Sequence, residues 1–244
     1  AEVLEKEGDP CTRVYVHWLG MNRRMDTWVS ADQVIPDYQP TNEELLQFLA
    51  VADPSILRDT DIGRTQGKRL FSEADSDHDE EEIIEHEKLT KVKNLDSIVL
   101  GRYCVGTWYF SPYPEEVTRQ SKTLYIDEFT LRFFPSERAM HRFQRKSPFR
   151  HPPGDEIYRD GNISVFEVDG RKERIYCQNL CLLAKLFLDH KNFRDEISPF
   201  LFYILCEIDR SGYHIVGYFS KEKCSDQDFN LACILVLPPY QRRG

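Results

Sequence analysis

Three segments near the end of the chain are long, mostly apolar and strand-like, and they constrain the fold more than any other feature of the sequence. They are Phe200 to Ile208, Tyr213 to Phe219 and Phe229 to Leu237, with polar residues between them. Strands that are apolar on both faces lie in the middle of a covered sheet. The second half of the chain is therefore expected to contain a sheet core.

Shorter patterns precede these segments. Strands are expected at Thr123–Ile126, Phe129–Phe134, Ile163–Val168 and Arg174–Cys177. The pair Asp169-Gly170 is a hairpin signal between the last two of these strands. From Asn179 to His190 the apolar residues recur at helical spacing, which predicts a helix with one buried face. This order of elements predicts an α+β fold.

Charge and cysteine content restrict the function classes. The 41 acidic residues outnumber the 32 basic ones and give a formal net charge of -9, so any contact with nucleic acid must be local. The seven cysteines contain no Cys-x-x-Cys pair, which indicates a reducing compartment rather than a disulfide framework. No apolar run approaches the ~20 residues of a membrane helix and no signal peptide opens the chain, so we expect a soluble intracellular protein.

The first third of the chain is organised differently. Strand patterns at Arg13–Leu19 and around Trp28-Val29 predict part of a small β module within residues 1–36. Residues 37–86 are expected to be a linker that is helical from Glu43 to Val51 and then acidic and disordered. The folded core is expected at 87–244. Because the chain begins with Ala1 and ends at Gly244 directly after a strand pattern, we expect it to be truncated at both ends.

The C-terminal run carries the clearest chemical signal. An apolar strand leads through Pro238-Pro239-Tyr240 into Gln241-Arg242-Arg243-Gly244. A glycine-containing loop ahead of a helix presents unpaired backbone N–H groups to an anion such as a pyrophosphate. The edge of the preceding strand could also pair with an amide-rich chain. Taken alone the turn is a weak signal, and a basic turn after a strand is the ordinary alternative.

Several motifs together resemble the MYST family of histone lysine acetyltransferases. They are Leu89 to Leu95, Thr107 to Pro114, His151 to Arg159, Asn179 to Lys191, Val216 to Lys223 and the C-terminal strand and turn. The resemblance covers roughly 85–244, and the motifs together are highly specific. It implies a GNAT-like acetyltransferase core, C-terminally incomplete here, with acetyl-CoA as the co-substrate and lysines of nucleosomal histone tails as acceptors.

The resemblance also implies roles for individual residues. By motif position, Cys233 matches the family's active-site cysteine and Lys191 its autoacetylated lysine. The positions that match its coenzyme-binding strand and loop are Ile234, Leu235, Val236, Gln241, Arg242, Arg243 and Gly244. A thiolate can accept the acyl group of a thioester, whereas a lysine ammonium, with a reference pKa of about 10.4, first needs a base. In the family this base is a glutamate beyond the loop, which the chain does not reach.

Read without the family, the same two residues have ordinary explanations. Cys233 would be a buried structural thiol, and Lys191 would be a cation at a helix C-terminus. Whether Cys233 is acylated or only shapes the site stays open at this stage.

Many family members carry a zinc finger with Cys, Cys, His and Cys ligands. Alignment on His151-Pro152-Pro153-Gly154 places Asp127, Thr130, Phe143 and Ser147 at the ligand positions. These residues do not form a set of N and S donors for tetrahedral zinc. We therefore expect a zinc-finger-like module at about 120–152 that binds no metal and is held by apolar contacts, with His141 as a surface or packing residue.

Residues 1–36 resemble the second half of a chromo barrel. Tyr15, Trp18 and Trp28 are candidates for an aromatic cage around a methylated lysine, but aromatic residues that alternate in a β module are more often core, and we favour that interpretation. Arg23-Arg24 is a candidate contact to RNA or DNA phosphate, or ordinary turn surface.

Taken together, the resemblance implies a nuclear histone acetyltransferase that regulates transcription and chromatin. Its expected partners are histone tails, nucleosomes and subunits of a chromatin complex, with no membrane. The alternative is a non-catalytic chromatin-binding adaptor or inactive fragment, which the missing second loop glycine and missing glutamate favour.

Overall fold

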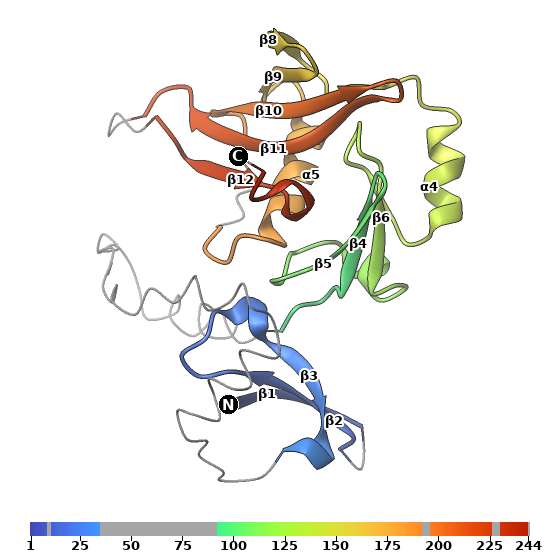
Figure 1. Cartoon of the computed structure of the whole chain (residues 1–244), viewed down its shortest axis with the longest axis vertical. Coiled ribbons are helices and arrows are strands. Elements are labelled where there is room, and N and C mark those ends of the chain that lie inside the picture. Colours follow the sequence, from blue (N-terminus) through green and yellow to red (C-terminus); the bar gives the residue numbers. More distant parts are fainter. Residues whose placement is uncertain (9–10, 35–91, 192–195, 226–229, 244) are drawn as a thin grey trace.

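Figure 1 shows the computed structural model of the chain, which describes residues 1–8, 11–34, 92–191, 196–225 and 230–243. The described residues form three sheets with helices between and beside them, which confirms the α+β prediction. The expected helix at Glu43–Val51, the expected linker at 37–86 and Gly244 lie outside the described residues.

The N-terminal residues form a small antiparallel sheet in the order β1-β2-β3. The two expected strands are β2 (Arg13–His17) and β3 (Thr27–Ser30), and two short 3-10 turns, η1 (Arg23–Met25) and η2 (Ala31–Gln33), flank β3. The first strand, β1 (Glu2–Glu7), was not predicted, because its side chains are nearly all exposed and show no apolar alternation.

A four-stranded sheet follows, in the order β5-β4-β6-β7. Its strands are β4 (Ser97–Leu100), β5 (Tyr103–Gly106), β6 (Thr123–Ile126) and β7 (Phe133–Phe134). The short helix α3 (Glu115–Thr118) lies in the connection that makes β6 parallel to β4, and α4 (Glu137–Gln144) follows β7. Figure 1 shows this unit in green and yellow-green, with α4 at its outer side.

The strand expected at Phe129–Phe134 is shorter in the structure. Only Phe133–Phe134 is a strand, because the chain first makes a tight turn in which Leu131 N donates to Asp127 O at 2.7 Å. Leu131 adopts a left-handed φ of 55° in this turn. The aromatic pattern was therefore correct as a buried segment and wrong as a continuous strand.

The largest sheet is antiparallel, in the order β12-β11-β10-β9-β8. Its strands are β8 (Asp155–Asp160), β9 (Ile163–Asp169), β10 (Phe200–Asp209), β11 (Gly212–Glu222) and β12 (Cys233–Val236). The prediction of a strand at Arg174–Cys177 was wrong, because these residues open the helix α5 (Arg174–Lys185). Tyr176, Leu180 and Leu183 are buried at helical spacing, so the apolar stripe begins one turn earlier than expected.

Buried side chains of α5, of the five-stranded sheet and of the four-stranded sheet form one hydrophobic cluster. Leu124, Leu183, Leu186 and Ile204, drawn from all three, are completely buried within it. Burial of each such side chain contributes about 1.5–3 kcal/mol. The core therefore joins the two sheets through α5. Among the described residues, none of the helices has the length and apolar character needed to cross a bilayer.

The aromatic run after β5 fixes the C-terminal end of α5. Trp108 N and Tyr109 N both donate to Leu186 O at 3.0 Å, and Ser111 Oγ donates to Leu182 O at 2.7 Å. These bonds satisfy carbonyl groups that a helix end leaves without partners. They determine where the chain continues toward Lys191.

Candidate active site

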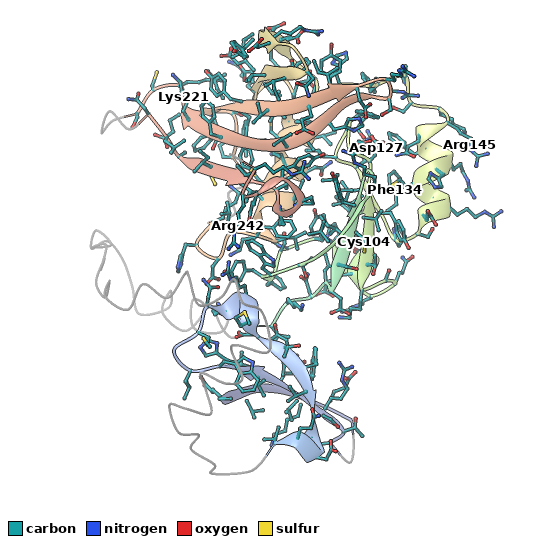
Figure 2. All side chains as sticks on the ribbon, viewed as in Figure 1. Cys104, Asp127, Phe134, Arg145, Lys221 and Arg242 are labelled. Carbon is teal, nitrogen blue, oxygen red and sulfur yellow. The ribbon has the colours of Figure 1, made fainter. Side chains whose placement is uncertain are left out.

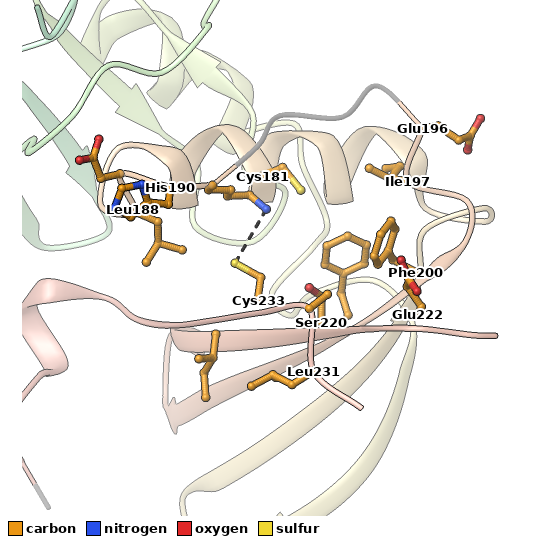
Figure 3. Close-up of a pocket in the computed structure, with 15 residues that line it drawn as sticks. Cys181, Leu188, His190, Glu196, Ile197, Phe200, Ser220, Glu222, Leu231 and Cys233 are labelled. Carbon is orange, nitrogen blue, oxygen red and sulfur yellow. Dashed lines mark hydrogen bonds between the residues drawn. The ribbon is translucent and has the colours of Figure 1, made fainter. Parts of the chain in front are cut away.

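A cavity of about 670 Å³ lies between the end of α5 and the β12 side of the five-stranded sheet (Figure 3). Its lining comes from the segment after α5, from the start of β10 and from β11 and β12. Lys191 and Cys233, which the sequence marked as site residues, both line it. A volume of this size is in the range of small-molecule sites.

Lys191 and Cys233 meet inside this cavity. Lys191 Nζ lies 3.9 Å from Cys233 Sγ, as the dashed line in Figure 3 shows. Lys191 follows the end of α5, and Cys233 is the first residue of β12. The ammonium group is placed to donate a hydrogen bond to the sulfur and to stabilise negative charge that develops on it during a reaction.

A second donor to the sulfur is Tyr218, to which the sequence assigned no role. Its hydroxyl donates to Cys233 Sγ at 3.3 Å. Tyr218 pairs with Leu235 across β11 and β12, so Tyr218, Leu235 and Cys233 share one face of the sheet. Burial raises the pKa of Tyr218 well above its usual range, and the neighbouring Cys233 raises it further, so the hydroxyl remains a donor.

The missed role of Tyr218 has a clear cause. It lies in the motif from Val216 to Lys223, and alternation along that strand indicates a buried position without saying which residue of another strand it faces. Only the pairing of β11 with β12 supplies this neighbour. A side chain at Gly217 would collide with Leu235 O, 2.4 Å from the added Cβ, so the glycine allows the strands to approach at this point.

Cys181 of α5 also lies beside Lys191. Burial raises the pKa of the Cys181 thiol, and the charge and hydrogen bond of Lys191 oppose that shift. Three carboxylates, Asp189, Glu196 and Glu222, line the same cavity and also received no role from the sequence. The cavity thus combines one lysine with two thiols and three carboxylates.

The residues that match the coenzyme-binding positions lie at one edge of the sheet. Ile234 and Val236 are 60% and 40% exposed, whereas Leu235 between them is buried, as expected for a strand with one covered face. Among the described residues β12 pairs with β11 alone, so no second strand pairs with the backbone groups of its other edge. This edge begins at Cys233.

The basic turn follows directly. Gln241 Nε2 donates to Val236 O at 2.7 Å, which folds the turn back onto β12. Arg242 adopts a left-handed φ of 61°. The Arg243 guanidinium lies 5.0 Å from the centroid of the Tyr240 ring. Hydrogen bonds from Arg243 and Arg102 lower the pKa of the Tyr103 hydroxyl.

The four positions aligned with zinc ligands do not fit a zinc ion. Asp127 is 1% exposed, and its Oδ2 accepts hydrogen bonds from Thr130 N at 3.0 Å and Thr130 Oγ1 at 2.6 Å. Its Oδ1 accepts from Gln144 Nε2 at 3.1 Å. Phe143 packs against Phe134 with ring centroids 5.4 Å apart. Figure 2 labels Asp127 and Phe134 on this unit.

One carboxylate, two hydroxyl groups and a phenyl ring lack the thiolate and imidazole ligands that structural zinc takes. Across the described ranges, no cluster of three or more His, Cys, Asp or Glu is placed to hold a metal ion. His141 is an exposed residue of α4, and its Nε2 lies 3.4 Å from Glu137 Oε1.

In the N-terminal sheet, Tyr15 is 1% exposed and packs against Trp28 with ring centroids 5.4 Å apart. Its hydroxyl donates to Asp26 O at 3.3 Å. Tyr15 is therefore core, whereas Trp18 and Trp28 are half-buried, so the favoured interpretation holds for Tyr15 alone. Arg13 lies over Trp28, 5.5 Å from the ring centroid.

The basic turn η1 contacts the acetyltransferase-like part of the chain. Arg23 Nη1 lies 3.5 Å from Asp189 Oδ1, and Arg24 lies 5.7 Å from the centroid of the Trp108 ring. Asp189 lines the cavity two residues before Lys191. Of the two candidate phosphate contacts, Arg23 thus borders the candidate active site through Asp189.

Three family models match separate parts of the chain. The model described as the MOZ/SAS family matches residues 151–244, the MYST family zinc finger domain matches 92–146, and the RNA binding activity-knot of a chromodomain matches 1–36.

Similar curated proteins are histone acetyltransferases by name. The chain is 46% identical over 230 residues to the putative MYST-like histone acetyltransferase 1 of Oryza sativa subsp. japonica, covering 94% of this chain and 50% of the relative. It is 47% identical over 230 residues to the histone acetyltransferase of the MYST family 1 of Arabidopsis thaliana, covering 94% and 51%. It is 40% identical over 280 residues to the histone acetyltransferase ESA1 of Kluyveromyces lactis, covering 100% and 62%. The chain therefore spans about half to three fifths of the length of these relatives.

Proposed function

The chain belongs to the MYST family of histone acetyltransferases, and we propose that it transfers acetyl groups from acetyl-CoA to lysine side chains of nucleosomal histone tails. The observation that carries the proposal is the position of the Cys233 sulfur, which lines a cavity at the start of an open strand edge and has two donors, Lys191 and Tyr218.

Coenzyme binding uses the edge of β12 and the turn after it. The pantetheine arm contains amides that can pair with the backbone of Ile234 to Val236, as an added strand does. The backbone amides of the turn from Gln241 onward, with the charges of Arg242 and Arg243, suit the diphosphate. The thioester carbon would then lie close to Cys233, because this residue begins the same strand.

Cys233 is the proposed acyl acceptor. Its thiolate attacks the thioester carbonyl, the carbon–sulfur bond of the coenzyme breaks, and coenzyme A leaves as a thiolate that takes up a proton. Hydrogen bonds from Lys191 and Tyr218 stabilise negative charge on the attacking sulfur. The neutral amine of the substrate lysine then attacks the acyl carbon, the bond from that carbon to the Cys233 sulfur breaks and restores the thiolate, and the amine releases one proton to solvent.

Lys191 is the proposed autoacetylation site. Its Nζ lies 3.9 Å from the Cys233 sulfur, which carries the acetyl group in the proposed intermediate. Acetylation of this amine removes the cation beside the sulfur. Glu196 and Glu222 give the cavity negative charge, which suits the approach of a lysine from a basic histone tail.

The test uses the full-length protein with labelled acetyl-CoA and a histone tail peptide, comparing wild type with Cys233→Ala. We expect label on the peptide with wild type and a loss of at least about a hundredfold in the variant. Wild-type protein that transfers no label would contradict the proposed activity. Equal transfer by the variant would show that the protein acetylates the peptide without an acyl-cysteine intermediate.

The proposed setting is the nucleus, with nucleosomes and subunits of a chromatin complex as partners. Contact with RNA through residues 1–36 is supported by the match to the RNA binding activity-knot and by the basic turn η1. A methyl-lysine cage is not part of the proposal, because Tyr15 is enclosed in the core.

The proposed organisation is a partial chromo barrel at 1–36, a linker at 37–86 and an acetyltransferase domain at 87–244. Its zinc-finger-like module, about 120–152, is proposed to fold without metal. The hydrogen bonds of Asp127 with Thr130 and Gln144 support this, because they join the two segments that zinc ligands would connect.

A further inference from the structure

The segment Arg138 to Arg150 is strongly basic although the whole chain carries a net charge of -9. Its 13 residues include five Lys or Arg and no Asp or Glu. All five of these cations are exposed. A local concentration of positive charge on an acidic protein indicates a specific anionic partner.

The helix α4 arranges part of this charge on one face. Ser136 Oγ accepts a hydrogen bond from Ala139 N and caps the helix, and Met140 is buried on its inner face. Arg138, Arg142 and Arg145 follow one another at spacings of four and three residues, so they form one stripe on the exposed side. Figure 2 shows Arg145 directed away from the body of the molecule.

This arrangement has an energetic cost in the free protein. Like charges three or four residues apart on a helix repel one another and destabilise it. Glu137 is the single acidic residue of α4, and among the described residues the one ion pair of the helix joins it to His141. The stripe therefore remains uncompensated by acidic neighbours within its own helix, and an anionic partner would relieve the repulsion.

We propose that the basic stripe of α4, formed by Arg138, Arg142 and Arg145 and extended by Lys146 and Arg150, binds the phosphate backbone of duplex DNA without reading the base sequence. A helix of eight residues is about 12 Å long, and duplex DNA carries one negative charge per about 1.7 Å of axis, so the stripe meets several phosphates. Guanidinium groups bind phosphate in a bidentate manner.

Duplex DNA fits this surface better than a single-stranded nucleic acid. Recognition of single strands uses aromatic side chains on which bases stack. The stripe presents four guanidinium groups and one ammonium group, and Phe143 of the same helix packs inward against Phe134. Phe149 is exposed between Lys146 and Arg150, but one ring does not make a platform for successive bases. The inference goes beyond the proposed acetyl transfer, which it does not require.

The test measures binding of a labelled DNA duplex to the full chain by fluorescence anisotropy at several salt concentrations. The variant carries Arg138→Gln, Arg142→Gln and Arg145→Gln. The matched control carries Arg171→Gln, Lys172→Gln and Arg174→Gln, three exposed residues at and before the start of α5 that change the net charge equally. Circular dichroism verifies that both variants keep the wild-type fold.

We expect the α4 variant to bind at least about tenfold more weakly than wild type, and the slope of log K against log salt to fall by roughly 2–3. The control should bind like wild type. A third variant with Arg138→Lys, Arg142→Lys and Arg145→Lys should keep most of the affinity, because the charge is preserved. Equal affinity of wild type and the α4 variant, or equal losses in variant and control, would overturn the inference.

Unlabelled single-stranded RNA and histone octamer are then added as competitors of the labelled duplex. A competitor that displaces the duplex at a lower concentration than unlabelled duplex DNA does is the preferred partner. Loss of octamer or RNA binding with unchanged duplex binding in the α4 variant would also overturn the assignment to DNA. All variants should acetylate a free histone peptide at the wild-type rate. If no protein, wild type included, transfers acetyl groups to the peptide, the proposed acetyltransferase function is contradicted and the DNA-binding inference is unaffected.

Discussion

Lys191 Nζ lies 3.9 Å from Cys233 Sγ, although 42 residues separate the two in the chain. The contact joins the segment after α5 to the first residue of β12, and it is the point at which the helix, the sheet edge and the cavity meet. The chemistry proposed for this protein depends on that meeting.

Replacement of Lys191 should lower the reactivity of Cys233. In Lys191→Gln the ammonium is lost, whereas Lys191→Arg keeps a cation. We expect alkylation of Cys233 at neutral pH to slow by roughly threefold to tenfold in the Gln variant, equivalent to about 0.7–1.4 kcal/mol for one hydrogen bond. Mass spectrometry of the Cys233 peptide after timed iodoacetamide treatment measures this rate. A Gln variant that reacts as fast as wild type would show that Lys191 does not act on the sulfur.

Removal of the Tyr218 hydroxyl should affect turnover more than coenzyme binding. Tyr218→Phe keeps the buried ring and removes the donor to Cys233 Sγ. We expect kcat to fall roughly fivefold, equivalent to about 1 kcal/mol, with the KM for acetyl-CoA unchanged. Steady-state kinetics on a histone peptide give both constants. A change confined to KM would place Tyr218 in coenzyme binding instead. Tyr203→Phe, in a half-buried position on the neighbouring strand β10, is the matched control.

The zinc-finger-like module should be insensitive to chelators. Wild-type protein should bind no zinc in elemental analysis, and its Tm should not change in EDTA. Asp127→Ala removes an acceptor for Thr130 and Gln144 and should lower the free energy of unfolding by about 1–3 kcal/mol. One zinc ion per chain, or a drop in Tm with EDTA, would contradict the metal-free proposal. Glu137→Ala, on the exposed surface of α4, controls for loss of a carboxylate.

Stability should depend on pH through His214. Its Nδ1 lies 2.8 Å from Glu128 Oε2, and its Nε2 lies 2.8 Å from Asp209 Oδ1. Burial opposes the charged form, but the hydrogen bonds to Glu128 and Asp209 outweigh it and raise the pKa of His214 in the folded protein. A raised folded pKa contributes stability below the unfolded value of about 6.5, and this contribution is lost as pH rises through the folded value.

Urea unfolding of wild type and His214→Gln at several pH values tests this dependence. The difference in free energy of unfolding between the two proteins should be largest at acidic pH and should shrink toward alkaline pH. A difference that is constant across this range would show that the imidazolium does not link the β10–β11 hairpin, which carries Asp209, to Glu128.

The contact between the N-terminal turn η1 and the residues beside the cavity could not be predicted from local sequence patterns. Arg23 and Arg24 were interpreted as phosphate contacts or turn surface, and the structure places them against Asp189 and Trp108. Sequence spacing carries no information about a contact between residues more than 80 positions apart.

Much of the central fold could be predicted because its burial repeats along the chain. The apolar runs that became β10 and β11 were found, since every second residue of a covered strand is buried. The strands β4 and β5 were not predicted, although β6, which is equally short, was; β8 was missed because its side chains are all exposed. The opening of α5 was misassigned because Arg174 to Cys177 is too short to distinguish a period of two from one of 3.6.

The sequence by itself determined the family, the loss of zinc ligands and the identity of Cys233 and Lys191 as candidates, because each depends on residue types at fixed spacing. Only the tertiary structure decided that these two residues meet, that Tyr218 joins them, and that Asp127 bonds to Thr130 and Gln144. Those contacts depend on strand register and on how α5 packs against the sheets. Periodicity shows which face of an element is buried, and long-range packing determines what that face touches.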